Sequence, residues 1–197
     1  MKKYVQVLSI FKFFFFFIYI FFSNLTVVLS SDSVWDEARQ GNKVILIRHS
    51  LAPGSGDPAG FKIGDCTTQR NLNKVGIEQS KKIGKILKDN KISIDIVLSS
   101  EWCRCKDTAY YAFGEFKEFS ALNSIFSIPF NKNEPKQAKE IKKYVMNWEG
   151  EGKNLILVTH YSVIAAITNA VPSSGEIVIT DKNLNVIGTI KTNQEAK

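Results

Sequence analysis

The chain has 197 residues, of which 44% are hydrophobic and 23% are charged, and its formal net charge is +7. This length suits one domain, and this composition is that of a globular protein rather than a disordered one. Residues 1–30 hold three lysines and no acidic residue, so the remainder has 23 basic and 19 acidic side chains, a net charge of +4. So mild an excess, with no dense basic block, does not indicate nucleic-acid binding and suits small anionic partners.

The N-terminal segment has the layout of an export signal. Two lysines precede an apolar stretch from about Val5 to Leu29, whose only charge is Lys12. A basic start, an apolar run and small residues after it are typical of a secretory signal, and cleavage is expected after Ser30. The stretch also suits an uncleaved anchor, since about 20 residues span a bilayer. Both interpretations export the rest of the chain, to the periplasm or beyond, with membrane contact only through an uncleaved N-terminal segment.

The rest of the chain is predicted to alternate short apolar strands with helices. A polar helix at about 32–40 lies in a short lead-in, residues 31–42, and the compact domain is expected at residues 43–191, before a polar tail at 192–197. Short continuous apolar runs are typical of strands buried on both faces. Such runs predict strands at 44–47, 94–98 and 154–158, a weaker strand at 116–119, and closing strands at 176–180 and 186–190.

Amphipathic spacing predicts the helices between these strands. In the segment 73–90, Ile83, Ile86 and Leu87 share one face, and Asn73 is the expected N-cap. Further helices are expected after Ser100 through about Tyr111, over 134–148 and over 162–169. This alternation implies an α/β fold with a mainly parallel central sheet and helices on both faces. Because ligands bind such sheets beyond the carboxyl ends of the strands, the residues at those ends are the candidate site.

Histidines and arginines stand at three of these strand ends. Arg48 and His49 follow the first strand, Arg104 lies a few residues past the second, and His160 follows the strand at 154–158. Arginine forks match the equatorial oxygens of a phosphoryl group, and a neutral imidazole can attack phosphorus. The other imidazole can stabilise the developing charge by hydrogen bonding, so this chemistry requires neither a metal nor a cofactor.

These residues belong to three motifs at three strand ends: Leu46-Ile47-Arg48-His49, Leu98-Ser99-Ser100 with Arg104 and Thr108-Ala109, and Val158-Thr159-His160. In this order they resemble the motifs of a known family, the histidine phosphatase superfamily, which includes phosphoglycerate mutases and many acid phosphatases. The resemblance covers roughly residues 43–190, and a further match, Asn71-Leu72-Asn73 with Gly76 and Gln79, is similar to the start of that family's first helix. It implies a phosphoglycerate mutase-like fold and a phosphoric monoester hydrolase in which His49 is the nucleophile.

The sequence departs from the family's pattern where the leaving group would be protonated. Members that resemble mutases carry a glutamate shortly past a leucine after the second arginine, whereas this segment reads Ala121-Leu122-Asn123-Ser124. Tyr161 stands where the acid-phosphatase branch has an aspartate, and Ser50 replaces the common glycine after the first histidine. A leaving group as good as an acyl phosphate or a phosphohistidine would need no proton donor.

Several polar residues are candidates for supporting roles. Arg70 and Asn71, at the end of a long glycine-rich loop, and Ser50 are expected to contact substrate. Four carboxylates are candidates for the general acid: Glu118 and Asp65 first, with Asp57 and Glu176 as further possibilities.

Three cysteines, Cys66, Cys103 and Cys105, lie close to the predicted site. In an oxidising compartment a disulfide from Cys66, either to Cys105 or to Cys103, is expected to tie the long loop to the second strand end and leave one thiol over. A zinc site is disfavoured because Cys-x-Cys is not the usual ligand spacing, and a cysteine nucleophile would need a Cys-x5-Arg cradle that is missing here.

The sequence therefore predicts an exported, metal-independent phosphatase that hydrolyses phosphate esters through a phosphohistidine, with a small phosphorylated substrate as its partner. The alternative, motivated by the missing glutamate, is a non-catalytic phosphate-binding or envelope-interaction module on the same fold. Substrate selectivity would lie in the loops 53–69 and 119–135, and their residues name no substrate.

Overall fold

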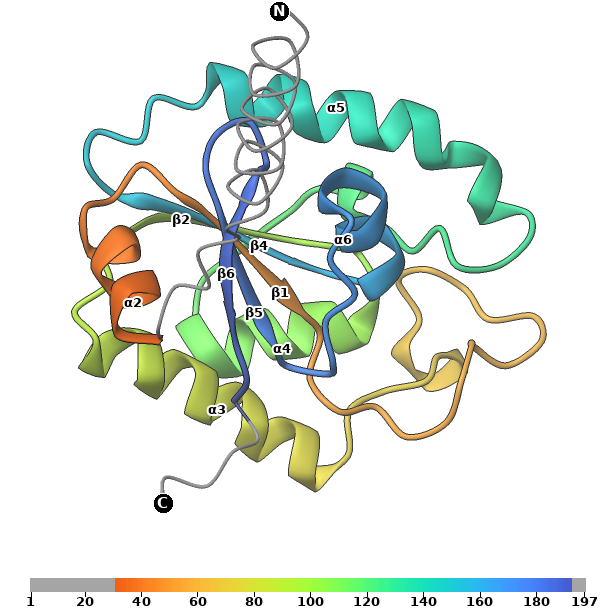
Figure 1. Cartoon of the computed structure of the whole chain (residues 1–197). Coiled ribbons are helices and arrows are strands. Elements are labelled where there is room, and N and C mark those ends of the chain that lie inside the picture. The colour runs from red at the N-terminus through yellow and green to blue at the C-terminus, as the bar shows by residue number, and fades with distance from the viewer. Residues whose placement is uncertain (1–30, 193–197) are drawn as a thin grey trace, which may run out of the picture.

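The computed structural model describes residues 31–192, which form a six-stranded sheet between two layers of helices (Figure 1). Three short 3-10 segments, η1 (Cys66–Thr68), η2 (Ser120–Leu122) and η3 (Phe130–Asn133), lie in the connections. The strands are β1 (Val44–Arg48), β2 (Ile94–Ser99), β3 (Lys117–Glu118), β4 (Asn154–Thr159), β5 (Ile177–Thr180) and β6 (Val186–Ile190). The helices are α2 (Ser31–Arg39), α3 (Lys74–Asp89), α4 (Cys103–Phe113), α5 (Glu134–Asn147) and α6 (Tyr161–Thr168).

The sheet has the strand order β3-β2-β4-β1-β5-β6. The first four strands in this order run parallel, whereas β5 is antiparallel to β1 and β6 is antiparallel to β5. The expected mainly parallel α/β sheet is confirmed, with two antiparallel closing strands that make the sheet a mixed one. Those two strands can pair through a short turn, whereas each parallel pair needs a crossover helix.

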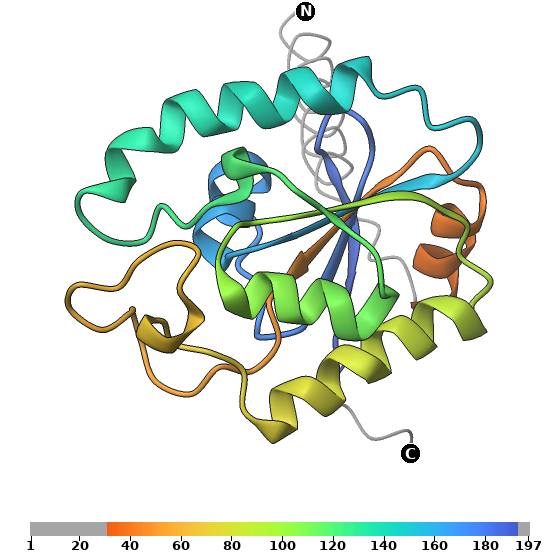
Figure 2. The same ribbon diagram turned by 180° about the vertical axis from the view of Figure 1, so that it is seen from behind.

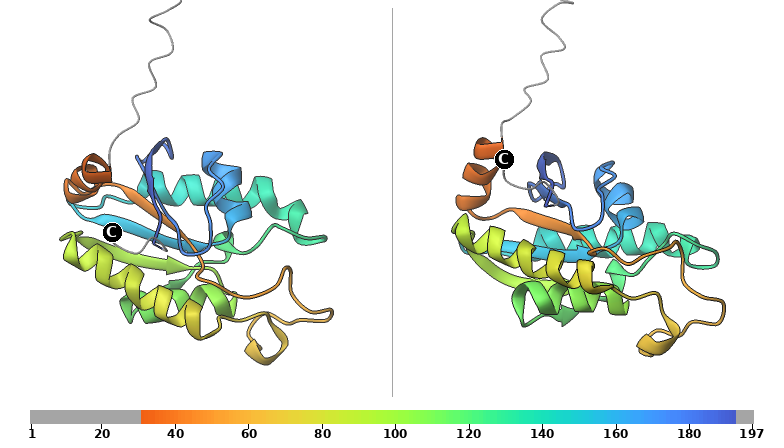
Figure 3. Two further views of the ribbon diagram at one scale, coloured as in Figure 1. Left: turned by 60° about the horizontal axis from the view of Figure 1, so that its bottom comes forward. Right: turned by 90° about the horizontal axis from the view of Figure 1, so that it is seen from below.

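The continuous apolar runs of the strands serve two separate cores. In β1, Ile45 and Ile47 pack against α2, α3 and α4, while Val44 and Leu46 pack against α5 and α6 on the other face. All four side chains are fully buried. Figures 2 and 3 show these two helical layers on either side of the sheet. Successive strand residues point to opposite faces, so a strand that is covered on both faces must be apolar throughout.

Helix α3 begins as the sequence predicts and then passes very close to the backbone that follows β1. The side chain of its N-cap, Asn73, accepts a hydrogen bond from the Gly76 backbone N–H at 2.8 Å. A Cβ atom on Gly76 would lie 2.1 Å from the Leu51 carbonyl oxygen. Glycine at this position therefore allows α3 to support the segment that carries the first strand-end histidine.

The folded unit begins earlier than residue 43. Helix α2 lies in the segment expected to be a polar lead-in, but Val34, Trp35 and Ala38 are buried in the core. The helix packs at the amino ends of the strands, where Asn154, the first residue of β4, donates a side-chain hydrogen bond of 2.9 Å to the Ala38 carbonyl. Most residues of this segment are polar, so its narrow apolar face gave only a weak sequence signal. The predicted domain boundary at 42/43 is therefore corrected to include α2.

The predicted signal or anchor at residues 1–30 lies outside the described residues, as do residues 193–197 of the predicted tail. The first residue of that tail, Thr192, is buried and donates a hydrogen bond of 3.0 Å to the Gly175 carbonyl, so it belongs to the domain. Over residues 31–192, none of the helices combines the length and the apolar character that crossing a bilayer requires.

Candidate active site

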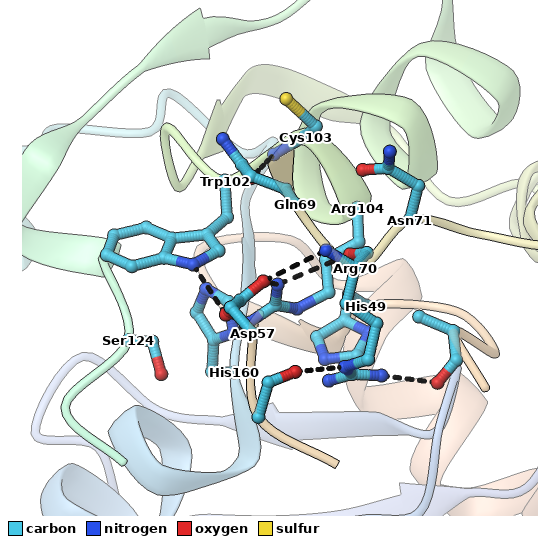
Figure 4. A network of polar contacts seen from close by, with 12 residues as sticks. His49, Asp57, Gln69, Arg70, Asn71, Trp102, Cys103, Arg104, Ser124 and His160 are labelled. Carbon is cyan, nitrogen blue, oxygen red and sulfur yellow. Dashed lines mark hydrogen bonds and ion pairs between the residues drawn. The ribbon is translucent and has the colours of Figure 1, made fainter. Parts of the chain in front are cut away.

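The four residues predicted at the strand ends line one pocket of about 110 Å³. Figure 4 shows three of them, His49, Arg104 and His160. They come together because β1, β4 and β2 are neighbours in the sheet and run parallel, which brings their carboxyl ends to one edge. The rings of His49 and His160 meet edge to face, with their centroids 5.3 Å apart. Arg48 and Arg104 line the same pocket.

His49 is held as a neutral imidazole with one defined tautomer. Its Nδ1 lies 2.8 Å from the carbonyl oxygen of Ser50. Because a carbonyl can only accept, Nδ1 must carry the hydrogen, which leaves the lone pair on Nε2. Burial, together with the charge of Arg104, lowers the pKa of His49 to about 3. At neutral pH the Nε2 lone pair is therefore available for attack on an electrophile without prior deprotonation.

His160 is also neutral, and its ring is fixed by polar neighbours. Burial and the nearby His49 lower its pKa well below the ordinary value. Its Nε2 lies 3.1 Å from Oγ of Ser100, and that hydroxyl lies 3.1 Å from Oδ1 of Asn123. Nδ1 of His160 is 3.5 Å from Nη2 of Arg104, a group that only donates. The ring is thus oriented beside the arginine expected to hold phosphate.

The two strand-end arginines are held differently. Arg48 donates a 2.9 Å hydrogen bond to the Pro172 carbonyl, and its guanidinium lies 5.0 Å from the ring centre of Tyr161. Arg104 is buried, with 3% of its side chain exposed, and forms a two-point ion pair with Asp57. The Nε–H of each arginine is buried without a partner in the described part of the chain. Unsatisfied donors of this kind are costly unless an anion completes them.

Asp57 is the acidic residue that the structure brings into the pocket. Its carboxylate oxygens accept hydrogen bonds from Nη1 and Nη2 of Arg104 at 2.8 and 3.1 Å, from Nε1 of Trp102 at 3.1 Å and from the Arg70 backbone N–H at 3.1 Å. Burial raises the pKa of this carboxyl, but the hydrogen bonds and charge of Arg104, together with the hydrogen bonds from Arg70 and Trp102, outweigh burial and hold the pKa below its usual value. Sequence reasoning placed Asp57 behind two other acids, because nothing in the loop motif Gly-Asp-Pro shows where the loop folds.

The other three acid candidates lie elsewhere. Glu118 is on the edge strand β3 and forms an exposed ion pair with Lys106 at 3.1 Å. The Asp65 carboxylate caps η1 by accepting from the Thr67 backbone N–H. Glu176 accepts a hydrogen bond from the Ser173 backbone N–H at 2.8 Å. None of the three lines the pocket, so the proton-donor predictions for Glu118 and Asp65 find no support in the geometry.

One of the three expected substrate contacts reaches the pocket. Arg70 lines it, and its guanidinium donates to the carbonyls of Gly56 and Ala52. Ser50 is fully buried behind the pocket, where its backbone N–H donates to Thr108. Asn71 donates to the Cys66 carbonyl, outside the pocket. Arg70 therefore both holds the loop 50–69 in place and adds positive charge to the pocket.

The disulfide joins Cys66 to Cys103, with 5.7 Å between their Cα atoms. A Cys66–Cys105 bridge is therefore wrong, and the physical reason lies in the helix. Cys103 is the first residue of α4 and faces the loop, whereas Cys105 faces the core, with Sγ 3.4 Å from Nε2 of His160. Burial raises the pKa of the Cys105 thiol to about 12, so it is no thiolate nucleophile.

Over residues 31–192, His, Cys, Asp and Glu side chains form no group of three or more that could hold a metal ion. The chemistry that the described residues supply is that of anion binding by guanidinium groups around a neutral imidazole.

Comparison with known proteins supports the same fold. No family model and no curated protein matches the sequence. Among solved structures, the chain is similar to the protein histidine phosphatase SixA complexed with tungstate (TM-score 0.55, 15% identity, covering 76% of this chain and 97% of the other). It is also similar to a mutant phosphoserine phosphatase from Entamoeba histolytica in complex with phosphoserine (TM-score 0.54, 17% identity, covering 77% of this chain and 98% of the other). A third similar structure is phosphoglycerate mutase from Thermus thermophilus (TM-score 0.53, 16% identity, covering 76% of this chain and 98% of the other). The chain therefore has the fold shared by histidine phosphatases and phosphoglycerate mutases.

Proposed function

We propose that this chain is an exported phosphatase that transfers the phosphoryl group of a phosphate monoester to Nε2 of His49 and then to water, without a metal ion. The observation that carries the proposal is the state of His49. Its Nδ1 is tied to the Ser50 carbonyl, so a neutral Nε2 is available in a pocket that three arginines surround. Neutral imidazole, enclosed among guanidinium groups, is the arrangement that attack on an anionic phosphoryl group requires.

The reaction proceeds in two displacements. In the first, the His49 lone pair forms a bond to phosphorus while the bond to the leaving oxygen breaks, and that oxygen takes a proton. In the second, water attacks the phosphohistidine and gives up a proton to solvent, the P–N bond breaks, and its electron pair returns to Nε2. Arg48, Arg70 and Arg104 surround the group in both steps and compensate the charge on its oxygens.

The remaining lining of the pocket indicates how the rest of the substrate is held. Phe61, Trp102, Phe126 and Tyr161 line it together with small hydroxyl side chains. Aromatic walls of this kind pack against an apolar or planar group, while the hydroxyls offer hydrogen bonds to a polar one. Two structural neighbours are a protein histidine phosphatase and a phosphoserine phosphatase. Phosphoserine is a phosphate monoester, whereas phosphohistidine carries a P–N bond, so the phosphoserine phosphatase is the neighbour that supports a phosphomonoester as the substrate class.

Export is part of the proposal, and two features support it. The N-terminal residues have the composition of a signal or anchor. The Cys66–Cys103 disulfide also suits an oxidising compartment, because disulfides are rare in the reducing cytosol. Detection of the processed or anchored chain in an envelope fraction, rather than in the cytosolic one, is the corresponding test.

The catalytic proposal is tested with the purified full chain, an aryl phosphate and a chelator. The wild type should release phosphate with the chelator present, and His49→Ala should reduce release to background. Glu118→Gln is the matched control, since this exposed acid lies outside the pocket and its loss should leave turnover unchanged. Equal turnover in the wild type and in His49→Ala would refute the mechanism.

A second candidate function is a non-catalytic phosphate-binding module, and one observation favours it. A carboxylate, Asp57, occupies the Arg104 fork, while Ser124 lines the pocket in the segment where mutase-like members carry a glutamate. A rapid-quench experiment with labelled substrate distinguishes the two functions. An acid-labile, base-stable phosphoenzyme that is absent from His49→Ala supports catalysis, and thermal stabilisation by phosphate without such an intermediate supports the binding module.

A further inference from the structure

The loop 50–69 delivers one carboxylate, that of Asp57, into a site built from cationic groups. Every hydrogen-bond donor that contacts it comes from the pocket wall, and two of the four come from the fork of Arg104. Only 8% of the side chain is exposed. The charged and titratable groups that face the same pocket are Arg48 from β1, Arg70 from the loop, Arg104 from α4, Tyr161 from α6, and the two histidines that follow β1 and β4. Among residues 31–192, Asp57 is the only carboxylate that lines this pocket.

Substrate and Asp57 compete for the same two donors. A phosphoryl group beside His49 needs the Arg104 fork, because a guanidinium binds the oxygens of an anion in pairs. The Asp57 carboxylate already uses both terminal nitrogens of that fork. Two anions that share one cation repel each other at close range, and one of them is driven to its protonated form.

After phosphate displaces Asp57 from Arg104, the protonation state of Asp57 depends on the hydrogen bonds that it keeps. Without Arg104 its remaining contacts are the neutral Trp102 indole and the Arg70 backbone N–H, and it then faces a phosphate dianion. Loss of the ion pair, burial and like charge all favour the neutral carboxyl group. The displaced side chain stays at the pocket, because Arg70 holds the Gly56 carbonyl at 2.6 Å and the Cys66–Cys103 disulfide ties the same loop to α4.

We propose that Asp57 is the proton donor for the leaving group, and that an arriving phosphate makes it one by displacing it from Arg104. This role rests on the proposed phosphatase function. The displaced carboxylate takes a proton from solvent and passes it to the leaving oxygen as the P–O bond breaks and the His49–P bond forms. The resulting carboxylate then accepts a proton from the water that attacks phosphorus, and the P–N bond breaks. The missing glutamate of the η2 segment is thereby replaced from a different part of the chain.

The test compares the full-length wild type with Asp57→Asn on phosphate esters that differ in leaving group. For an alkyl phosphate, whose alkoxide leaves poorly, Asp57→Asn should lower kcat by about 10²- to 10⁴-fold, the usual size of general-acid catalysis. For 4-nitrophenyl phosphate, whose phenolate leaves without a proton, the loss should be at most several-fold, and a phosphoenzyme on His49 should still be trapped. Asp57→Glu should restore part of the alkyl activity. Asp65→Asn is the matched control, because that acid of the same loop caps η1 outside the pocket.

Three results would overturn the proposal, and each is distinct. An equal loss on both esters would show that Asp57 only positions Arg104. An equal gain on both would show that the carboxylate merely blocks the pocket. A wild type that hydrolyses neither ester and forms no phosphoenzyme would overturn the phosphatase function itself, and this role with it. Thermal unfolding of each variant with and without inorganic phosphate identifies a variant that fails to fold. If Asp57→Asn does not fold, the relative activities of Asp57→Glu on the two esters decide between these outcomes.

Discussion

Removing the Cys66–Cys103 disulfide should cost a large part of the stability of this domain. The bond joins residues separated by 37 positions in the sequence. For a loop of that length, the chain-entropy model gives about 4 kcal/mol at 25 °C. Domains of this size are stable by only about 5–15 kcal/mol, so the double variant Cys66→Ala, Cys103→Ala should remain folded but be markedly less resistant to denaturant.

Urea unfolding followed by tryptophan fluorescence measures the effect. Trp102 is well placed as a reporter, because it is buried beside the disulfide and donates to Asp57. The oxidised wild type should exceed the double variant by roughly 3–4 kcal/mol in unfolding free energy. A reducing agent should remove most of that difference from the wild type and leave the double variant unchanged. A difference under about 1 kcal/mol, or an equal effect of reductant on both proteins, would refute the reasoning.

Four further predictions concern the pocket and its support. The pKa of His49 is about 3 in the folded chain and near 6.5 when unfolded, so its contribution to the free energy of unfolding is fully present above pH 6.5 and is lost as pH falls toward 3, at about 1.4 kcal/mol per pH unit. In urea titrations at several pH values, the unfolding free energy of His49→Gln should therefore fall less steeply with decreasing pH than that of the wild type. Thiol titration should find no reactive group in the native chain and one after denaturation without reductant, because Cys105 is buried and unpaired; a reactive native thiol would contradict its placement. Gly76→Ala forces a Cβ against the Leu51 carbonyl and should lower stability by about 1–3 kcal/mol, measured by urea unfolding. Arg104→Lys keeps a charge but loses the two-point geometry, so inorganic phosphate should bind more weakly by calorimetry; unchanged affinity would remove Arg104 from the phosphate site.

Much of the fold could be predicted because the strands are buried on both faces. That burial requires runs such as Val44 to Ile47 to be wholly apolar, and the runs mark the strands clearly. The start of helix α3 could also be predicted, because asparagine is a common N-cap and the Asn73 side chain accepts a hydrogen bond from the Gly76 backbone N–H. Helix α2 was underrated, because three buried residues in a polar segment give a weak signal. The pairing order of the strands is a property of the whole chain, and no single segment encodes it.

The same contrast holds at the candidate site. His49 and His160 directly follow strands, so the position of each follows from the strand before it, and adjacent parallel strands bring them together. Asp57 lies in a loop that no regular element directs, and its position depends on contacts with Arg104 and Trp102 that are 45 or more residues away along the chain. The choice between Cys103 and Cys105 depended on which side of α4 faces the loop. Residues placed by secondary structure were predictable here, and residues placed by tertiary contacts were not.

The packing of α2 at the amino ends of the strands places this helix at the end of the sheet opposite the pocket. The pocket lies at the carboxyl ends, and Figure 3 shows α2 and the loop 50–69 at opposite ends of the sheet. Helix α2, with which the described part of the chain begins, therefore lies at the end of the domain away from the pocket. A domain attached to a solid support directly through this helix would hold the pocket toward solution, within reach of diffusing phosphate esters.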